Sequence, residues 1–192
     1  MSDVSPKPST RSPRADAARN RMRLLDAAKT VFSAGGPEAS LEAVARTAQV
    51  GIGTLYRHFP TREALFEAVY RREVDELAAL AEASVGAPAE ALRAWVKANV
   101  EFVATKKGMA AALALAAYNK DLSAYSFPRL TQAAGLLIGR ARQAGALRTD
   151  ITPQELMRAV LGFCVVNDQP GWRETALTLI DVFLDGLLLR GD

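Results

Sequence analysis

The segment SLEAVARTAQVGIGTLYRHFPTR, residues 40–62, decides the fold that we expect for this chain. Its apolar residues recur at helical spacing on both sides of a break at residues 49–51. Ser40 is a typical N-cap for the first short helix, and Pro60-Thr61 marks the start of a longer helix after the second. Two short helices joined by such a turn are typical of a helix-turn-helix, whose second helix enters the major groove of DNA.

The second short helix, residues 52–59, has an apolar side and a polar side when its residues are spaced at roughly 100°. Ile52, Leu55 and Phe59 form the apolar side, which we expect to pack against the helices before and after the motif. Tyr56 lies at the edge of this side, where its hydroxyl can reach outward. Gly53, Thr54, Arg57 and His58 face the other way, so the outward side combines a small residue, a hydroxyl, a cation and an imidazole.

These residue types suit particular contacts. Gly53 permits a close approach, Arg57 suits a guanine or a phosphate, and Thr54 suits a base edge or a thymine methyl group. Ser40 and Arg62 lie at helix starts, where backbone N–H groups and a cation can bind phosphate. The pattern leaves an alternative open, because short helix pairs occur in many all-α proteins and a lone histidine is often a packed or capping residue.

The charge of the chain is unevenly distributed along its length. The net charge is +3 over 192 residues, of which 49% are hydrophobic and 23% charged, as in an ordinary globular protein. Residues 1–62 hold 10 basic and 5 acidic side chains, whereas residues 63–192 hold 14 and 16. A basic excess confined to one end favours contact with nucleic acid there. Residues 1–15, rich in Pro and Ser, are expected to be a disordered basic tail, or an arm that enters a DNA groove.

Cysteine and histidine usage argues against several classes of site. Cys164 is the one cysteine and His58 the one histidine, so neither an intramolecular disulfide nor a Cys/His zinc site is expected. No cofactor or metal is expected either. The chain shows no signal peptide, and its longest uncharged apolar stretch, residues 108–119, is too short for a membrane span. We therefore expect a cytoplasmic protein without membrane contact.

The remaining pattern predicts an all-α protein of about nine helices, because no segment alternates apolar and polar residues long enough for a strand. The helix-turn-helix domain is expected to span residues 16–62 and to be completed by the start of a fourth helix, residues 61–84, with a second helical domain over residues 85–192. The expected helices cover residues 16–34, 40–48, 52–59, 61–84, 88–105, 108–119, 128–144, 152–167 and 172–189.

The motif resembles one family of regulators. The run GTLYRHF, residues 53–59, followed by REALF, residues 62–66, is similar to the signature of tetracycline-repressor-type (TetR family) proteins, as is the helix before it. The resemblance covers about residues 20–70. It implies an all-α homodimeric transcription factor, usually a repressor, with a DNA-binding domain and a domain that binds a small effector and dimerises. It also implies that Thr54, Tyr56 and His58 contact DNA and that Arg62 holds a phosphate.

The sequence departs from this pattern at two positions. Gln49 stands where the family commonly has a turn glycine, and it is expected to adopt a left-handed conformation at some energetic cost. Gly51 stands where a serine or threonine often precedes the second helix, so that helix is expected to lack a side-chain cap. Both departures affect the details of the contacts rather than the motif.

The last two helices have broad apolar faces, which the resemblance assigns to a four-helix interface between two subunits. The alternative is that these side chains only fill the core of one chain. The residues predicted for the interface are Met157, Val160, Leu161, Cys164, Leu177, Ile180, Phe183, Leu184 and Leu187.

Effector-site candidates are large or polar side chains on otherwise apolar helices, since pockets in helical domains lie between helices and are mostly apolar. They are Trp95, Asn99, Phe102, Met109, Tyr118, Phe127 and Asn167. For any single one of them, ordinary core or surface is the favoured interpretation. Lys106-Lys107 is interpreted as a solvated helix end, with a site for an acidic ligand as the alternative, and Cys164 as packing rather than a redox sensor.

We therefore expect a dimeric repressor that leaves a palindromic double-stranded operator when an unidentified small molecule binds. An enzyme is not expected, because no nucleophile–base pair, GxSxG, P-loop or HExxH pattern is present. A helical adaptor that binds only protein or small molecules is the alternative, and it would leave the polar face of residues 54–58 without a purpose.

Overall fold

The computed structural model describes residues 13–34, 39–112, 120–148, 150–165 and 170–189. These residues form eight helices, with one isolated bridge between Leu147 and Leu188 as their only β pairing, so the predicted all-α class is confirmed. The helices are α1 (Pro13–Ala34), α2 (Leu41–Thr47), α3 (Ile52–His58), α4 (Arg62–Ala83), α5 (Pro88–Ala112), α6 (Lys120–Gln143), α7 (Pro153–Val165) and α8 (Trp172–Leu187).

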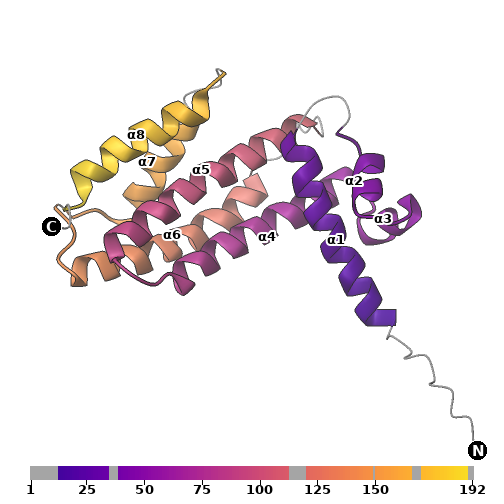
Figure 1. The fold of residues 1–192 in the computed structure, drawn as a ribbon, viewed down its shortest axis with the longest axis horizontal. Coiled ribbons are helices and arrows are strands. Elements are labelled where there is room, and N and C mark those ends of the chain that lie inside the picture. The colour runs from indigo at the N-terminus through magenta and orange to yellow at the C-terminus, as the bar shows by residue number, and fades with distance from the viewer. Residues whose placement is uncertain (1–12, 35–38, 113–119, 149, 166–169, 190–192) are drawn as a thin grey trace, which may run out of the picture.

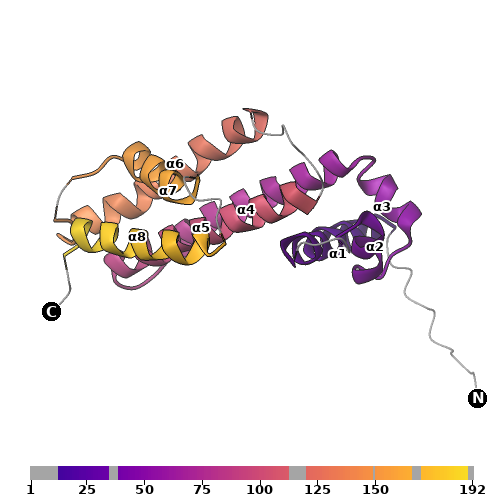
Figure 2. The ribbon, with the colours of Figure 1, turned by 90° about the horizontal axis from the view of Figure 1, so that it is seen from above.

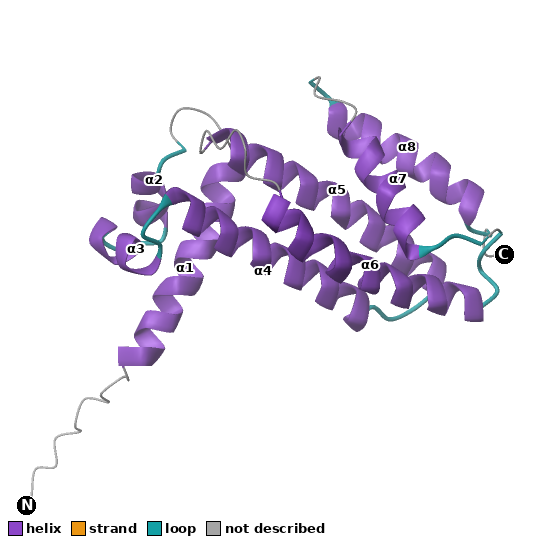
Figure 3. Cartoon of the chain, turned by 180° about the vertical axis from the view of Figure 1, so that it is seen from behind, coloured by secondary structure: helices purple, strands orange, loops and turns teal. Residues whose placement is uncertain are grey.

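The helices form two groups along an elongated molecule. α1, α2 and α3 gather at one end, and α5 to α8 make up the other part (Figures 1 and 2). α4 and α5 join the two groups, because both contact α1, and α4 also packs against α5 and α6. From behind, α6 runs beside α4 (Figure 3). α4 is therefore a helix through which the packing against α5 and α6 and the packing against α1 are physically connected.

The boundaries of two helices differ from the sequence prediction because a glycine and a proline lie inside them. α5 is one helix through Lys106-Lys107, where two helices were predicted. Gly108 lies in α5 where it meets α1, and a Cβ there would be 3.2 Å from the backbone oxygen of Phe32, so this glycine serves helix packing rather than a break. α6 begins before Pro128, and packing of its first turns on α4 outweighs the hydrogen bond that proline removes.

Two further boundaries are close to the prediction. α1 begins at Pro13 rather than at Asp16, in keeping with the preference of proline for the first helical turn. At α7, the predicted capping box is confirmed: the Thr152 backbone N–H donates to Glu155 Oε2 over 2.8 Å, and the Glu155 N–H donates to Thr152 Oγ1 over 3.2 Å.

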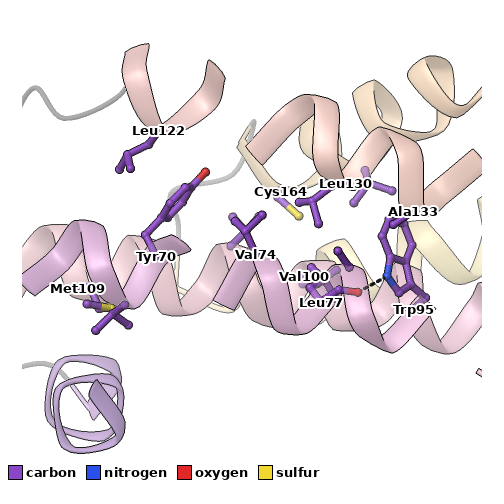
Figure 4. Packing of buried hydrophobic residues seen from close by; sticks show 14 of the residues in the cluster. Tyr70, Val74, Leu77, Trp95, Val100, Met109, Leu122, Leu130, Ala133 and Cys164 are labelled. Carbon is purple, nitrogen blue, oxygen red and sulfur yellow. Dashed lines mark hydrogen bonds between the residues drawn. The ribbon is translucent and has the colours of Figure 1, made fainter. Parts of the chain in front are cut away.

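One hydrophobic core runs through both groups of helices. Figure 4 shows part of it, with Trp95 of α5 pointing toward α4 and Cys164 of α7 near Leu130. The buried Trp95 indole N–H donates to the Leu77 backbone oxygen over 2.8 Å, which ties α5 to α4. Among the described residues, no helix is long and apolar enough to cross a membrane.

Candidate nucleic-acid interface and internal cavity

The turn between α2 and α3 has the geometry expected from the sequence. Gln49 has a φ of 54°, in the left-handed region that favours glycine. Its side-chain oxygen accepts a hydrogen bond from the Arg23 guanidinium of α1 over 3.0 Å, and the Val50 backbone N–H donates to the Ala45 oxygen. Gly51 precedes α3 without a side-chain cap. Both expected departures are therefore present, and the helix-turn-helix forms around them.

The buried side of α3 differs from the prediction at its first residue. Leu55 and Phe59 are buried, as expected, but Ile52 is 40% exposed and does not form part of the apolar wall. Val50, in the turn before α3, packs against the core instead. Ile52 is the first residue of α3. The side chain of Val50, just before the helix, already packs against the core there, so the Ile52 side chain remains outside.

The opposite side of α3 is open. Tyr56 is 45% exposed and Arg57 is exposed, whereas Thr54 and His58 are half-buried. The His58 ring lies 6.3 Å from the Phe59 ring, so the histidine packs partly against the core residue beside it. A Cβ on Gly53 would meet no atom within 4 Å, so the fold of this chain does not itself require a glycine there. Polar side chains and an unobstructed glycine thus lie together on the outward side of α3.

Three arginines near α3 have no acidic partner within ion-pair distance among the described residues. Within the described part of the chain, Arg46, Arg57 and Arg62 form no ion pair, and Arg46 and Arg57 are the basic residues in the last turns of α2 and α3. By contrast, Lys29 of α1 pairs with Glu73 over 2.5 Å. Arg46 was missed by the sequence prediction, although its place in the last turn of the first motif helix was a signal. Unpaired exposed cations are available to phosphate.

Ser40 is engaged as a cap in this structure. Its Oγ accepts a hydrogen bond from the Ala43 backbone N–H over 3.1 Å, which confirms the predicted N-cap of α2. Hydrogen bonds from its own backbone N–H and from the Ser40 hydroxyl lower the pKa of Glu42, and nearby Arg62 lowers it further. Ser40, Glu42 and Arg62 therefore form one polar cluster where the starts of α2 and α4 come close. A phosphate contact from Ser40 or Arg62 stays a prediction.

A cavity of about 460 Å³ lies in the second group of helices, between α4, α5, α6 and α7. This volume falls within the range that holds a drug-sized ligand. Apolar side chains form most of its wall, with two lysines, an amide and hydroxyls among them. The lining residues are Tyr70, Asn99, Phe102, Val103, Lys106, Lys107, Ser123, Ser126, Phe127, Leu130, Met157, Val160, Leu161 and Val165.

The predicted effector residues separate into three sets. Asn99, Phe102 and Phe127 line the cavity. Trp95 and Met109 are buried outside its wall, and the indole of Trp95 is committed to the hydrogen bond with α4. Tyr118 and Asn167 lie outside the described residues. The sequence prediction missed Tyr70, because it did not include α4, and it missed Ser126, because it considered only large or amide side chains. For Lys106-Lys107 it favoured a solvated helix end and kept a ligand site as the alternative; both lysines line the cavity.

Most of the side chains predicted for a subunit interface are buried inside the chain. Six of the predicted side chains are buried within the single chain and are therefore unavailable to a partner subunit. They are Met157, Val160, Cys164, Ile180, Leu184 and Leu187. Leu161 is exposed, and Leu177 and Phe183 are half-buried. On α7 and α8, the large exposed apolar residues not predicted for the interface are Val165, Leu179 and Val182, the last at 67%. α8 is apolar on two faces, and the more strongly apolar one is the internal face.

Comparison with known proteins bears on both groups of helices. Residues 24–69 match the family model described as bacterial regulatory proteins, tetR family. Residues 87–189 match the model described as the C-terminal domain of transcriptional regulators similar to SbtR. The first match spans α2, α3 and the turn between them, and the second spans α5 to α8, of which α5, α6 and α7 line the cavity.

Similar solved structures and curated relatives agree with these models. A TetR transcriptional regulator from Streptomyces coelicolor is 42% identical, with a TM-score of 0.74, over 89% of this chain and 99% of that one. A TetR regulatory protein from Mycobacterium vanbaalenii is 31% identical, with a TM-score of 0.72, over 93% and 100%. The HTH-type transcriptional repressor KstR of Mycolicibacterium smegmatis is 43% identical over 58 residues, 30% of this chain and 28% of that protein. The chain thus belongs to the TetR family of bacterial regulatory proteins.

Proposed function

We propose that this protein is a homodimeric transcriptional repressor, which binds a palindromic DNA operator and is released from it when a small molecule enters the cavity. The observation that carries the proposal is the outward face of α3. It combines an unobstructed glycine, an exposed tyrosine and an exposed arginine without an ion pair in the described chain. These are residue types that read base edges and hold phosphates in the major groove. A chromosomal operator would place the protein in the cytoplasm.

The DNA contacts proposed for this face extend beyond α3. Gly53, Thr54, Tyr56, Arg57 and His58 would face the groove, with Ser40, Arg46 and Arg62 on the flanking phosphates. The division of labour follows the two groups of helices: residues 16–62 bind DNA and residues 85–192 bind the effector and the second subunit. Members of the family bind DNA operators rather than catalyse reactions, which supports this division.

The response to an effector is proposed to pass through α4. Tyr70 of α4 lines the cavity, and Arg72 and Glu73 of the next turn form ion pairs with Asp26 and Lys29 of α1 over 2.6 Å and 2.5 Å. A ligand that moves Tyr70 therefore acts on a helix bonded directly to the DNA-binding end. A tilt of α4 changes the separation of the two α3 helices in a dimer. A dimer that no longer matches half-sites about one helical turn apart, ~34–36 Å, loses one of them.

The dimer is proposed to form through the outer face of α7 and α8. Leu179 and Val182 of α8 are exposed there. They lie three residues apart on one face of the helix, which the exposed positions 175 and 186, each four residues further along, continue in both directions. Burial of such a face in a symmetric pair is the ordinary way in which soluble subunits associate. The half-buried Phe163 and Phe183 rings, 5.8 Å apart, pack together beside it.

The experiment that tests this function is selection of bound DNA from random duplexes with the purified full-length protein. We expect an enriched palindrome whose half-sites are centred about one helical turn apart. We also expect the affinity for it to fall steeply as salt rises, since phosphate contacts release counterions. Selection that enriches no sequence over random DNA at low salt would contradict the proposal.

A further inference from the structure

The two adjacent lysines of α5 have different surroundings, although both line the cavity. Lys107 Nζ donates a hydrogen bond to the Cys164 backbone oxygen over 3.0 Å and lies 4.3 Å from the centre of the Trp172 ring. It is thereby fixed to α7 and α8 as part of the wall. The sequence pattern favoured a solvated helix end for this pair, but α5 continues past both residues to Ala112.

Lys106 is the cation left for a ligand. Its Nζ lies 5.4 Å from the centre of the Tyr70 ring, and within the described residues no acidic side chain is within ion-pair distance of it. The residue is half-buried, and desolvation lowers the pKa of its ammonium group. A partly buried ammonium without an anion is costly, and an anion that enters the cavity relieves that cost.

The neighbours of Lys106 supply hydrogen-bond donors. The Tyr70 hydroxyl donates to Ser126 Oγ over 2.7 Å, so the Ser126 proton is free to be donated elsewhere. Ser123, one turn earlier on α6, also lines the cavity. A ligand oxygen held by Lys106 would therefore have hydroxyl donors near it. Among the described residues, the wall contains two lysines and no acidic side chain, so its charge is complementary to an anion.

The rest of the cavity is apolar. Phe102, Phe127 and Leu130 contribute from α5 and α6, and Met157 and Val160 from α7. Apolar walls of this extent bind the hydrocarbon body of a ligand. A cation such as Lys106, with no acidic partner in the described part of the chain, favours a single negative charge at one end of an otherwise lipophilic molecule.

We propose that the effector is a lipophilic monocarboxylate, whose carboxylate pairs with Lys106 and whose apolar body lies among the α5, α6 and α7 side chains. That this ligand acts as an effector rests on the proposed function, whereas its binding in the cavity does not. Lys106 is the specificity-determining residue, because a neutral or cationic head group of the same size cannot pair with it. Binding next to Tyr70 places the ligand against α4.

The test uses the full-length protein and two acids, decanoate and phenylhexanoate, each beside its primary amide and its primary amine. Affinities are measured by isothermal titration calorimetry. We expect each acid to bind roughly tenfold or more tightly than its amide, as a charge-assisted hydrogen bond predicts, and the amine to bind no better than the amide. Equal affinity for acid and amide, or no detectable binding of either acid, overturns the proposal.

Variants identify the residue responsible. Lys106→Met keeps the volume and removes the charge, so it should lower acid affinity by roughly tenfold and leave amide affinity unchanged. Lys106→Arg should retain the preference for the acid. Lys97→Met is the matched control, since Lys97 lies on the same helix but pairs with Asp181 outside the cavity wall. A Lys106→Met protein that still prefers the acid would overturn the assignment.

Operator binding by the ligand-free protein separates this inference from the proposed function. If the wild-type protein binds its selected operator but shows no preference for acids, the effector class is wrong and the repressor stands. If acids bind through Lys106 but no DNA is selected, the site is right and the repressor is wrong. Melting followed by circular dichroism confirms that each variant is folded.

Discussion

The Tyr70 hydroxyl of α4 donates a hydrogen bond of 2.7 Å to the Ser126 hydroxyl of α6, and both side chains are buried. The Tyr70 ring also lies 5.3 Å from the Phe102 ring of α5. One side chain of α4 thus contacts both helices that face it across the cavity. α4 also carries the ion pairs to α1, which is why we propose that a change in the cavity acts on the DNA-binding end through Tyr70.

Replacement of Tyr70 by phenylalanine should reduce the free energy of unfolding by about 1 kcal/mol, because the ring remains but the Ser126 hydroxyl loses a buried partner. Urea denaturation measures the change. In the Tyr70→Phe background, a further Ser126→Ala change should cost less than it does in the wild type, since the pair is already broken. Additive costs would show that the two hydroxyls do not interact.

Ser40→Ala should reduce the free energy of unfolding by about 1 kcal/mol, because the α2 N-cap is lost. Ser40→Asn is the matched variant: asparagine caps about as well as serine, so most of the stability should return. Thermal or urea unfolding of the two variants checks this. If asparagine proved as destabilising as alanine, the hydrogen bond to the Ala43 N–H would not be the cause.

Val182→Glu should weaken the dimer by roughly thirtyfold or more, because a carboxylate would be buried in the proposed interface. Sedimentation velocity over a range of protein concentrations measures the association. Val85→Glu is the control, since Val85 is 93% exposed in the connection just beyond α4 and is not part of α7 or α8. A Val182→Glu protein that associates like the wild type would remove the outer face of α8 from the interface.

The Cys164 thiol should be unreactive in the folded protein. Burial raises its pKa from 9.0 to about 11, although Lys107 acts in the opposite direction. At pH 8, reaction with an aromatic disulfide should be roughly hundredfold or more slower than in denaturant, since the thiolate is the nucleophile. Rapid modification of the native protein would contradict this packing.

The same shift gives a pH dependence with a definite sign. The folded state holds the Cys164 proton more tightly than the unfolded state does, so this group's contribution to stability is lost as pH rises from 9.0 towards about 11. Over that range the wild type should lose more stability than Cys164→Ala. If the free energies of unfolding of the two proteins changed with pH in parallel, the thiol would contribute nothing to this pH dependence.

The DNA-binding end was largely predictable because its signals are local. The cap at Ser40, the left-handed Gln49 and the uncapped start of α3 each follow from a few adjacent residues. Ile52 was misplaced because a helical wheel does not show where the chain enters the helix, and Val50 takes its place in the core. Local periodicity therefore predicts which side of a helix is buried, but not whether the first and last residues on that side are buried too.

The cavity and the subunit face were harder to predict because they depend on distant packing. The sequence around Lys106 predicts a helix end, because Gly108 follows it. In the structure, Gly108 instead packs closely against the backbone of Phe32, and α5 continues. Likewise, two faces of α8 are apolar, and only the neighbouring helices decide which one is internal. Leu184 is buried and Val182 exposed for that reason.

The most direct test of the central claim, that the outward face of α3 reads DNA, compares Arg57→Ala with Arg148→Ala on the selected operator. Both variants remove one exposed arginine, but Arg148 lies in the turn between α6 and α7, outside the DNA-binding helices. Fluorescence anisotropy at fixed salt measures the affinity. We predict that Arg57→Ala binds the operator at least roughly tenfold more weakly, with folding and dimerisation retained, while Arg148→Ala binds like the wild type. Equal affinities for the two variants would contradict the account.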